Sequence, residues 1–166
     1  IPGTYVTNER LKETLVDAVS KYNIRPNQIE LEITETSYVG NIEEAIQAVL
    51  QFRKLGFLVA IDDFGTGYSS LSYLVRFPLD VLKIDRSFIQ QICILDDKQA
   101  IVDAIIQMSH RLNMKVVAEG VESAQQVELL KKMKCDYIQG FYYSKPLPID
   151  ELAEFLEFWE VEHQGR

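Results

Sequence analysis

The sequence has few of the residues that mark linker, fibrous or disulfide-rich chains. Its 166 residues include two cysteines, five prolines and eight glycines. So few prolines and glycines exclude a linker or a low-complexity segment. Cys93 and Cys135 are far apart and have no Cys or His nearby in ligand spacing, which favours reduced core thiols in a cytosolic protein. His110 and His163 are isolated and are predicted to be surface or packing residues.

The sequence also lacks a long apolar run and an excess of basic residues. No stretch reaches the roughly 18 apolar residues that span a membrane, and no signal-peptide pattern opens the chain. The 17 Lys and Arg residues against 25 Asp and Glu give a net charge of −8. A nucleic-acid polymer or an anionic membrane surface favours a basic face, so neither is expected as a partner. A phosphorylated small molecule stays open, because a bound metal ion can reverse the local charge.

Helical and strand-like segments alternate along the chain. Helical periodicity covers 9–22, 42–55, 70–75 and 100–112, a segment after Ser123, and the apolar stripe of 152–159; β-prone runs cover 29–34, 57–62, 81–85, 115–120 and 137–140. This alternation predicts parallel strands covered by helices, in a (β/α) barrel or a doubly wound sheet. No Gly-rich phosphate turn follows the first strand, which weakens the doubly wound interpretation. Five strands are too few to close an eight-stranded barrel, which takes about 250 residues.

Carboxylates end four consecutive predicted strands. They are Glu32, Glu35, Asp62, Asp63, Asp85, Glu119 and Glu122. The carboxyl ends of parallel strands form one face, so these acids should converge there. Converging carboxylates repel one another and lose solvation, and Mg²⁺ or Mn²⁺ would compensate because these ions prefer oxygen ligands. Two ions about 3.5–4 Å apart would provide the geometry of phosphodiester cleavage.

Lys83 lies two residues before Asp85 and is predicted to face the same side of its strand, among the acids. A structural ion pair is an equally good interpretation of this lysine. Single acids after strands are also common as helix caps and solvated loop residues. Two reactions fit the pattern: metal-dependent phosphodiester hydrolysis, and proton abstraction next to a carboxylate in an enolase-like barrel. The glycine-containing segment 64–74 fits a polar connection or a flap over the site.

Several long motifs then resemble one family. The sequences LEITE (31–35), AIDDFGTGYSSLSYL (60–74), LKID (82–85), VVAEGVE (116–122) and QGFYYSKPLP (139–148) resemble the EAL family. Its members are bacterial phosphodiesterases that cut the second messenger cyclic di-GMP to linear pGpG. The resemblance is collinear over about 29–148, and it implies a TIM-like (β/α) barrel. Here that means an incomplete barrel of about five parallel strands with flanking helices.

The resemblance implies a ligand set for two ions, Mg²⁺ or Mn²⁺. Glu32 and Asp62 resemble ligands of the first metal, with Asp62 bridging to the second. Asp63 and Glu119 resemble ligands of the second metal.

The resemblance also implies roles for the residues around the metals. Lys83 resembles the lysine that holds or polarises the attacking water, and Asp85 a supporting acid. Glu35 resembles the residue that anchors the flap. Glu122 and Gln139 match positions near the metal and the water.

The sequence departs from the family pattern at its amino-terminal side. The Glu-Ala-Leu tripeptide that names the family is absent, together with the strand that carries it and the next strand, which supplies an asparagine ligand. We therefore expect residues 1–166 to be an amino-terminally truncated EAL-type domain that lacks about three strands. Such a barrel has unpaired strand edges, so the chain should pair with another copy, exchange elements or belong to a longer protein.

The resemblance implies the following function and context. The parent protein is expected to hydrolyse cyclic di-GMP, with a catalytically inactive cyclic di-GMP-binding or protein-interaction module as the alternative. Expected partners are cyclic di-GMP, a second copy in a homodimer or strand-swapped assembly, and covalently linked sensory or diguanylate cyclase domains. The expected location is cytoplasmic, with membrane tethering of the parent protein left open.

Overall fold

The computed structural model describes residues 7–34, 42–65 and 74–163. The strands are β1 (Glu30–Thr34), β2 (Leu58–Phe64), β3 (Val81–Ile84), β4 (Lys115–Ala118) and β5 (Tyr137–Ile138). The helices are α2 (Glu9–Lys21), α3 (Ile42–Lys54), α5 (Arg86–Ile89), α6 (Asp96–Arg111), α7 (Ala124–Lys132) and α8 (Ile149–His163), and a 3₁₀ turn, η1, spans Pro26–Gln28. No helix in these ranges is long and apolar enough to cross a membrane.

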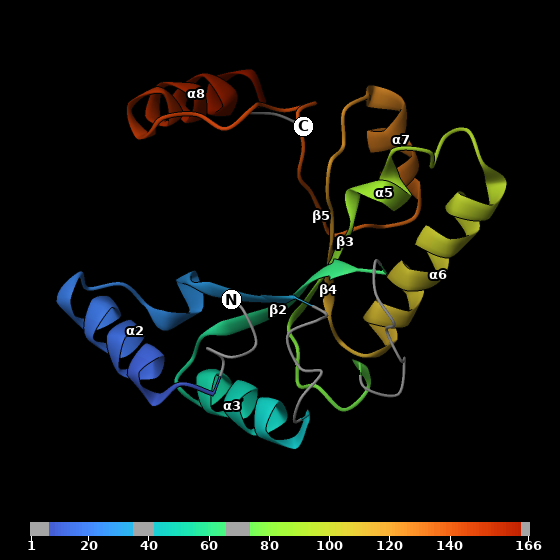
Figure 1. The fold of residues 1–166 in the computed structure, drawn as a ribbon. Coiled ribbons are helices and arrows are strands. Elements are labelled where there is room, and N and C mark those ends of the chain that lie inside the picture. The colour runs from blue at the N-terminus through green and yellow to red at the C-terminus, as the bar shows by residue number, and fades with distance from the viewer. Residues whose placement is uncertain (1–6, 35–41, 66–73, 164–166) are drawn as a thin grey trace.

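All five strands lie in one parallel sheet, in the order β1-β2-β3-β4-β5. Spatial order therefore follows chain order, and Figure 1 shows the sheet with α3 and α6 on its outer side. A doubly wound sheet reverses its strand order partway and carries helices on both faces. The sequential order is that of an arc of a (β/α) barrel, so the predicted barrel class is confirmed.

The outer face of the sheet forms the hydrophobic core. Alternate residues of β1 to β4 point into it and are buried, because successive side chains of a strand face opposite sides: Leu31, Ile33, Val59, Ile61, Leu82, Ile84, Val116 and Ala118. Val49 of α3, Val102 and Ile106 of α6, and Leu130 of α7 are fully buried against them. This packing holds the strands in place relative to one another. It therefore sets where the carboxyl end of each strand lies.

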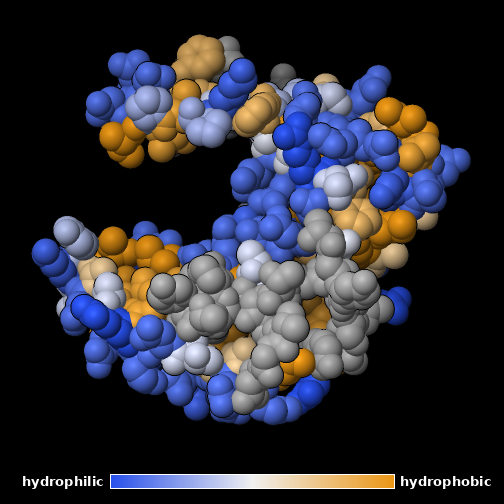
Figure 2. Space-filling view, in the orientation of Figure 1, coloured by the Kyte–Doolittle hydropathy of each residue, from blue (hydrophilic) through white to orange (hydrophobic). Residues whose placement is uncertain are grey.

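The inner face of the sheet is open. Figure 1 places α2 and α8 at the two ends of the curved sheet, and Figure 2 shows the space between them as a hollow with mostly hydrophilic residues at its base. Within the described ranges, β1 pairs only with β2 and β5 only with β4. Both outer edges of the sheet are therefore unpaired there, as the incomplete barrel predicts.

The ends of several helices follow local sequence signals. The side chain of Asn8 caps α2 by accepting a hydrogen bond from the Arg10 amide at 2.9 Å, and Ser123 and Gln126 form the predicted capping box of α7. Helix α6 begins four residues earlier than its apolar periodicity indicates. The helix predicted at 70–75 lies almost wholly outside the described residues.

Both cysteines are free thiols, as predicted. The expected core position is wrong for Cys93, which is exposed in the turn after α5. Cys135 is half-buried, and burial raises its pKa to about 11. Such a thiol is almost fully protonated at neutral pH and is therefore unreactive.

Candidate metal centre

Strand register brings four charged side chains to the inner face of the sheet. Glu32 of β1 pairs with the residue two positions before Asp62 of β2. Lys83 of β3 pairs with the residue two positions before Glu119, which directly follows β4. Residues two apart on a strand face the same side. The buried outer face therefore turns Glu32, Asp62, Lys83 and Glu119 together toward the hollow.

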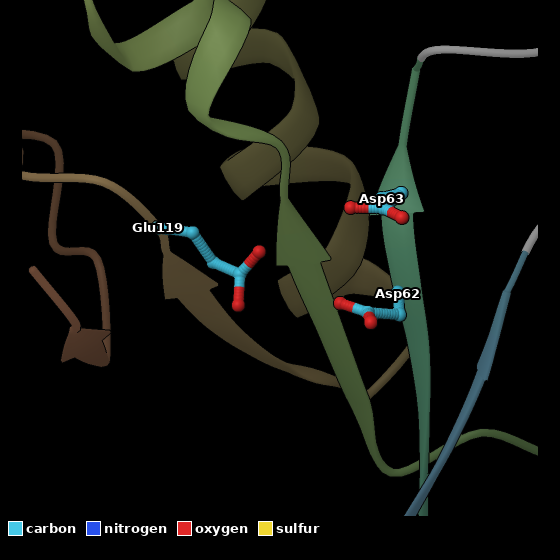
Figure 3. A group of neighbouring side chains, drawn as sticks. All are labelled: Asp62, Asp63 and Glu119. Atoms are coloured by element: carbon cyan, nitrogen blue, oxygen red, sulfur yellow. The ribbon is translucent and has the colours of Figure 1, made fainter. Parts of the chain in front are cut away.

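A bulge adds Asp63 to this group. The step from Ile61 to Phe64 on β2 lies opposite the shorter step from Leu82 to Ile84 on β3, so β2 carries one extra residue. Asp63 adopts a φ of 54°, in the left-handed region that Asp tolerates better than most residues. Regular alternation would point Asp62 and Asp63 to opposite faces. Figure 3 instead shows both carboxylates on the side of β2 that faces Glu119.

Three carboxylates form a compact oxygen cluster. One oxygen each from Asp62, Asp63 and Glu119 lies within 4.8 Å of the other two, and Figure 3 shows them converging from β2 and from the end of β4. Carboxylate oxygens are hard ligands that suit Mg²⁺ and Mn²⁺. Three of them at this spacing offer part of the coordination of such an ion.

Lys83 is the cation of the centre. Its ammonium lies 2.6 Å from Oε1 of Glu32, 3.1 Å from Oδ1 of Asp62 and 2.8 Å from Oε1 of Glu119. The residue is only 5% exposed. Burial by itself would lower the pKa of Lys83, but the contacts with Glu119, Glu32 and Asp62 outweigh burial and raise this pKa. Lys83 is therefore protonated at neutral pH.

One oxygen of Asp62 is only partly compensated by this neighbour. Its Oδ1 is buried, and its charged neighbour among the described residues is the Lys83 ammonium, 3.1 Å away, which also contacts Glu32 and Glu119. One ammonium shared among three carboxylates compensates each of them only in part, because buried charges need further partners for their remaining lone pairs. A cation bound between Asp62, Asp63 and Glu119 would satisfy this oxygen. The residues present thus fit a divalent metal ion.

The carboxylates of the centre together carry more negative charge than the single positive charge of Lys83 compensates. Burial raises the pKa of Glu119; Lys83 lowers it, while Asp62 and Glu32 raise it, and the net effect is upward. The pKa of Asp63 is also raised, first by burial and then by Asp62 and Asp85. These raised pKa values reflect burial and neighbouring carboxylates, and a cation bound nearby would lower them.

The other predicted site residues lie around this cluster in different roles. Asp85 lies beyond the end of β3, so strand alternation does not apply to it, and its side chain caps α5 by accepting from the Ser87 amide at 2.9 Å. Glu122 accepts a hydrogen bond from Nη2 of Arg86 at 2.7 Å. Gln139 follows β5 and accepts through its backbone oxygen from the Val121 amide at 3.1 Å. Glu35 lies outside the described residues.

Sequence reasoning missed the residues of α5 that contact the acid-bearing turns. Gly65, which follows Asp62 and Asp63 closely, has a φ of 100°, and a Cβ there would lie 2.6 Å from the ring of Phe88. Gly120 directly follows Glu119 and packs in the same way against Arg86. The available signal was a glycine just after each acidic strand end, which indicates a close approach of another chain segment.

Comparison with known proteins identifies relatives of this chain. The sequence profile of the EAL domain matches residues 1–146. The cyclic di-GMP phosphodiesterase NbdA of Pseudomonas aeruginosa is 48% identical over 134 residues, which are 81% of this chain and 17% of NbdA. The chain spans between a sixth and about a fifth of the length of curated relatives such as this one.

Solved structures show the same fold. The phosphodiesterase PaMucR in complex with c-di-GMP superposes with a TM-score of 0.85 and 37% identity, over 92% of this chain and 62% of PaMucR. A manganese and cyclic di-GMP complex of Klebsiella pneumoniae BlrP1 superposes with a TM-score of 0.77 and 34% identity, over 84% of this chain and 35% of BlrP1.

Proposed function

The chain belongs to the EAL domain family, and on that premise we propose that it is the metal-binding part of a phosphodiesterase that hydrolyses cyclic di-GMP to linear pGpG. The observation that carries this proposal is the cluster of Asp62, Asp63 and Glu119, in which one oxygen of each carboxylate lies within 4.8 Å of the other two. The reaction adds one water across one phosphodiester bond. A new P–O bond forms to the water oxygen, the P–O3′ bond breaks, and a proton ends on the released 3′ oxygen.

The ligand assignments follow the positions of the oxygens. Asp62, Asp63 and Glu119 would hold Mg²⁺ or Mn²⁺, and Glu32 would complete the set from β1. When bound, such ions supply a nucleophilic water at neutral pH and stabilise the charge that develops on the leaving oxygen. The protein contributes fixed geometry, because β2 and β4 hold their carboxylates on a sheet whose outer face is packed.

Lys83 acts as a hydrogen-bond donor rather than as a base. Its pKa is raised, so it stays protonated at the pH of catalysis. A protonated ammonium at the centre of the acids can orient the attacking water or a phosphoryl oxygen. It cannot accept the proton of the water.

The remaining assignments belong to the proposal as well. Glu122 and Gln139 would lie near the water and the substrate, Asp85 would support the centre from the start of α5, and Glu35 would anchor the flap. Residues 1–166 would form an amino-terminally truncated EAL domain of a longer cytoplasmic or membrane-tethered protein with sensory or diguanylate cyclase domains. The small share of the relatives that the chain spans supports a longer parent protein.

The second candidate is a module that binds cyclic di-GMP or a protein without turnover. The favouring observation is that the compact cluster found among the described residues has three members, all of them carboxylates. The Glu-Ala-Leu tripeptide and the asparagine ligand expected for the first metal have no counterpart in the sequence. A centre with fewer ligands binds metal more weakly and is less able to activate water.

The decisive experiment is to incubate the chain with cyclic di-GMP and Mn²⁺ and to look for pGpG by chromatography. The hydrolytic function predicts product from the wild type and none from Asp62→Asn, which keeps the shape of the side chain but removes its charge. Asp17→Asn, on the exposed face of α2, is the matched control and should behave as the wild type. Bound cyclic di-GMP without product would establish the second candidate, and product from Asp62→Asn would overturn the ligand assignment.

A further inference from the structure

Arg86 lies against the turn that carries Glu119, although nothing in the metal-ligand pattern points to it. The turn runs from Glu119 at the end of β4 to Ser123, the cap of α7. Gly120 has a φ of 68°, and a Cβ built on it would lie within 2.8 Å of three carbon atoms of the Arg86 side chain. The aliphatic part of Arg86 thus covers Gly120 at van der Waals distance.

The guanidinium of Arg86 is held by two hydrogen-bond acceptors, Glu122 and Gln90. Nη2 donates to Oε1 of Glu122 at 2.7 Å. With the Gln90 amide oriented so that its oxygen faces the donors, Gln90 accepts from Nε at 2.8 Å and from Nη2 at 3.1 Å. Arg86 therefore joins the first turn of α5 to the turn that follows β4.

The rest of the turn is held by other groups. The Val121 amide donates to the Gln139 oxygen at 3.1 Å, and the Glu122 amide donates to the side chain of Gln126 at 2.8 Å. The Glu119 amide donates to the Ile84 oxygen at 3.1 Å. Gly120 lies between these fixed points, and glycine has the freest backbone of all residues. The Arg86 side chain packs directly on Gly120 and so restricts the backbone there.

We propose that Arg86 is a positioning residue of the metal centre: its side chain, packed on Gly120 and paired with Glu122, holds Glu119 in the orientation that lets its carboxylate converge with Asp62 and Asp63. This inference rests on the proposed metal site and deepens it. The contacts that carry the inference are those of Arg86 with Gly120 and Glu122. Arg86 acts through the backbone that presents Glu119, as residues around a ligand commonly do for metal affinity.

Charge and position make opposite predictions for the loss of Arg86. Removing one positive charge beside an acidic cluster makes the site more negative, so a purely electrostatic role predicts tighter cation binding. A positioning role predicts weaker binding, because Glu119 loses its fixed orientation. The side chains of Arg86 and Glu122 are 52% and 46% exposed, so the loss of their ion pair should change fold stability little.

The test is the affinity of the full chain for Mn²⁺ alone, measured by isothermal titration calorimetry, with the melting temperature of each variant recorded alongside. Arg86→Ala should weaken Mn²⁺ binding about tenfold without a matching fall in melting temperature. Arg86→Lys keeps the charge and most of the stem and should recover most of the affinity. Arg53→Ala removes the same charge from the ion pair with Asp80, at the opposite end of β2 and β3, and should leave Mn²⁺ affinity unchanged.

Each other outcome overturns a different statement. Unchanged or tighter Mn²⁺ binding by Arg86→Ala, beside a wild type that binds, overturns the positioning role and leaves the proposed function standing. A wild type that binds no Mn²⁺ overturns the metal centre itself, and the positioning role with it. If Arg86→Ala fails to fold, Arg86→Lys decides. An affinity of Arg86→Lys for Mn²⁺ about tenfold below that of the control Arg53→Ala would contradict positioning by the stem and the charge, because lysine retains both.

Discussion

At the scale of single residues, Lys83 determines the charge balance of the centre. It is buried among Glu32, Asp62 and Glu119 and carries the positive charge that offsets them. We predict that Lys83→Met lowers the free energy of unfolding by about 3 kcal/mol in EDTA, because a buried group of carboxylates loses its counter-ion. Thermal melts should show this loss and its partial recovery on addition of Mn²⁺.

The control for this prediction is Lys131→Met. Lys131 is exposed and lies 3.4 Å from Glu128, so its ion pair contributes little to stability. A melting temperature of Lys83→Met equal to that of Lys131→Met in EDTA would show that the acids need no internal cation.

Asp136 is a second charged residue with several partners, and it lies at the opposite, amino-terminal ends of the strands. Its carboxylate accepts from Lys115 Nζ at 2.6 Å and from the Val116 amide at 3.0 Å, and it pairs with His110 at 2.7 Å. Burial alone would raise the pKa of Asp136, but the hydrogen bonds from Lys115, His110 and Val116 together lower it below 3.8. No pattern in the sequence indicates this pairing for His110, for which the prediction was a surface or packing residue.

This depressed pKa has a defined pH dependence. A carboxyl whose folded-state pKa is lowered stabilises the fold fully above its ordinary pKa, and the stabilisation is lost as the pH falls through the folded-state pKa. Asp136→Asn should therefore lower the free energy of unfolding by about 1.5–3 kcal/mol at pH 7, and the difference from the wild type should shrink below pH 3.8. Urea denaturation at both pH values measures it, and a difference that is constant down to pH 3 would contradict the assignment.

At the scale of elements, the short helix α5 connects the ends of β2, β3 and β4. Asp85 caps its start, Phe88 packs on Gly65 after β2, and Arg86 packs on Gly120 after β4. Its carboxyl end is held by Gln126 of α7, whose Nε2 donates to the Ile89 oxygen at 3.0 Å. A four-residue helix has little stability of its own. Its position therefore depends on these tertiary contacts.

Gln126 offers a direct test of this connection. Its side chain is 8% exposed, donates to Ile89, and accepts from the amides of Glu122 and Ser123. We predict that Gln126→Ala lowers the free energy of unfolding by about 2–3 kcal/mol, because it leaves buried backbone groups without partners. The adjacent Gln125 is exposed, and Gln125→Ala should change stability by less than about 0.5 kcal/mol. Equal urea midpoints for the two variants would contradict the role of Gln126.

At the scale of the whole molecule, the open edges of β1 and β5 dominate the expected behaviour. Within the described ranges these strands have unpaired outer edges, and the inner face is open between α2 and α8, as Figure 2 shows. Unpaired strand edges template further pairing. We predict that the isolated chain self-associates or exchanges elements at micromolar concentration, and that its sedimentation coefficient rises with concentration. A folded monomer over that range in sedimentation velocity would contradict this prediction.

The sequence by itself determined the barrel class and the positions of the acids. Alternating apolar runs and helical periodicity predict parallel strands covered by helices, and collinear motifs identify the family. The acids lie in or after the predicted strands, and they are expected on one face because parallel strands place their carboxyl ends there. These features are local or depend on chain order, so a linear pattern is enough to find them. The roles of all the predicted site residues in a reaction remain predictions.

Only the tertiary structure decided which of these acids converge and what holds them. The bulge in β2 and the positive φ of Asp63 turn two adjacent carboxylates to one side, whereas alternation along a regular strand would separate them. Asp85 caps α5 because β3 ends one residue earlier. Lys83 binds three acids, from β1, from β2 and from the residue after β4. Arg86 covers Gly120, which is 34 positions away in the sequence. Such contacts depend on distances between strands, and those distances are set by the packing of the outer face rather than by any local pattern.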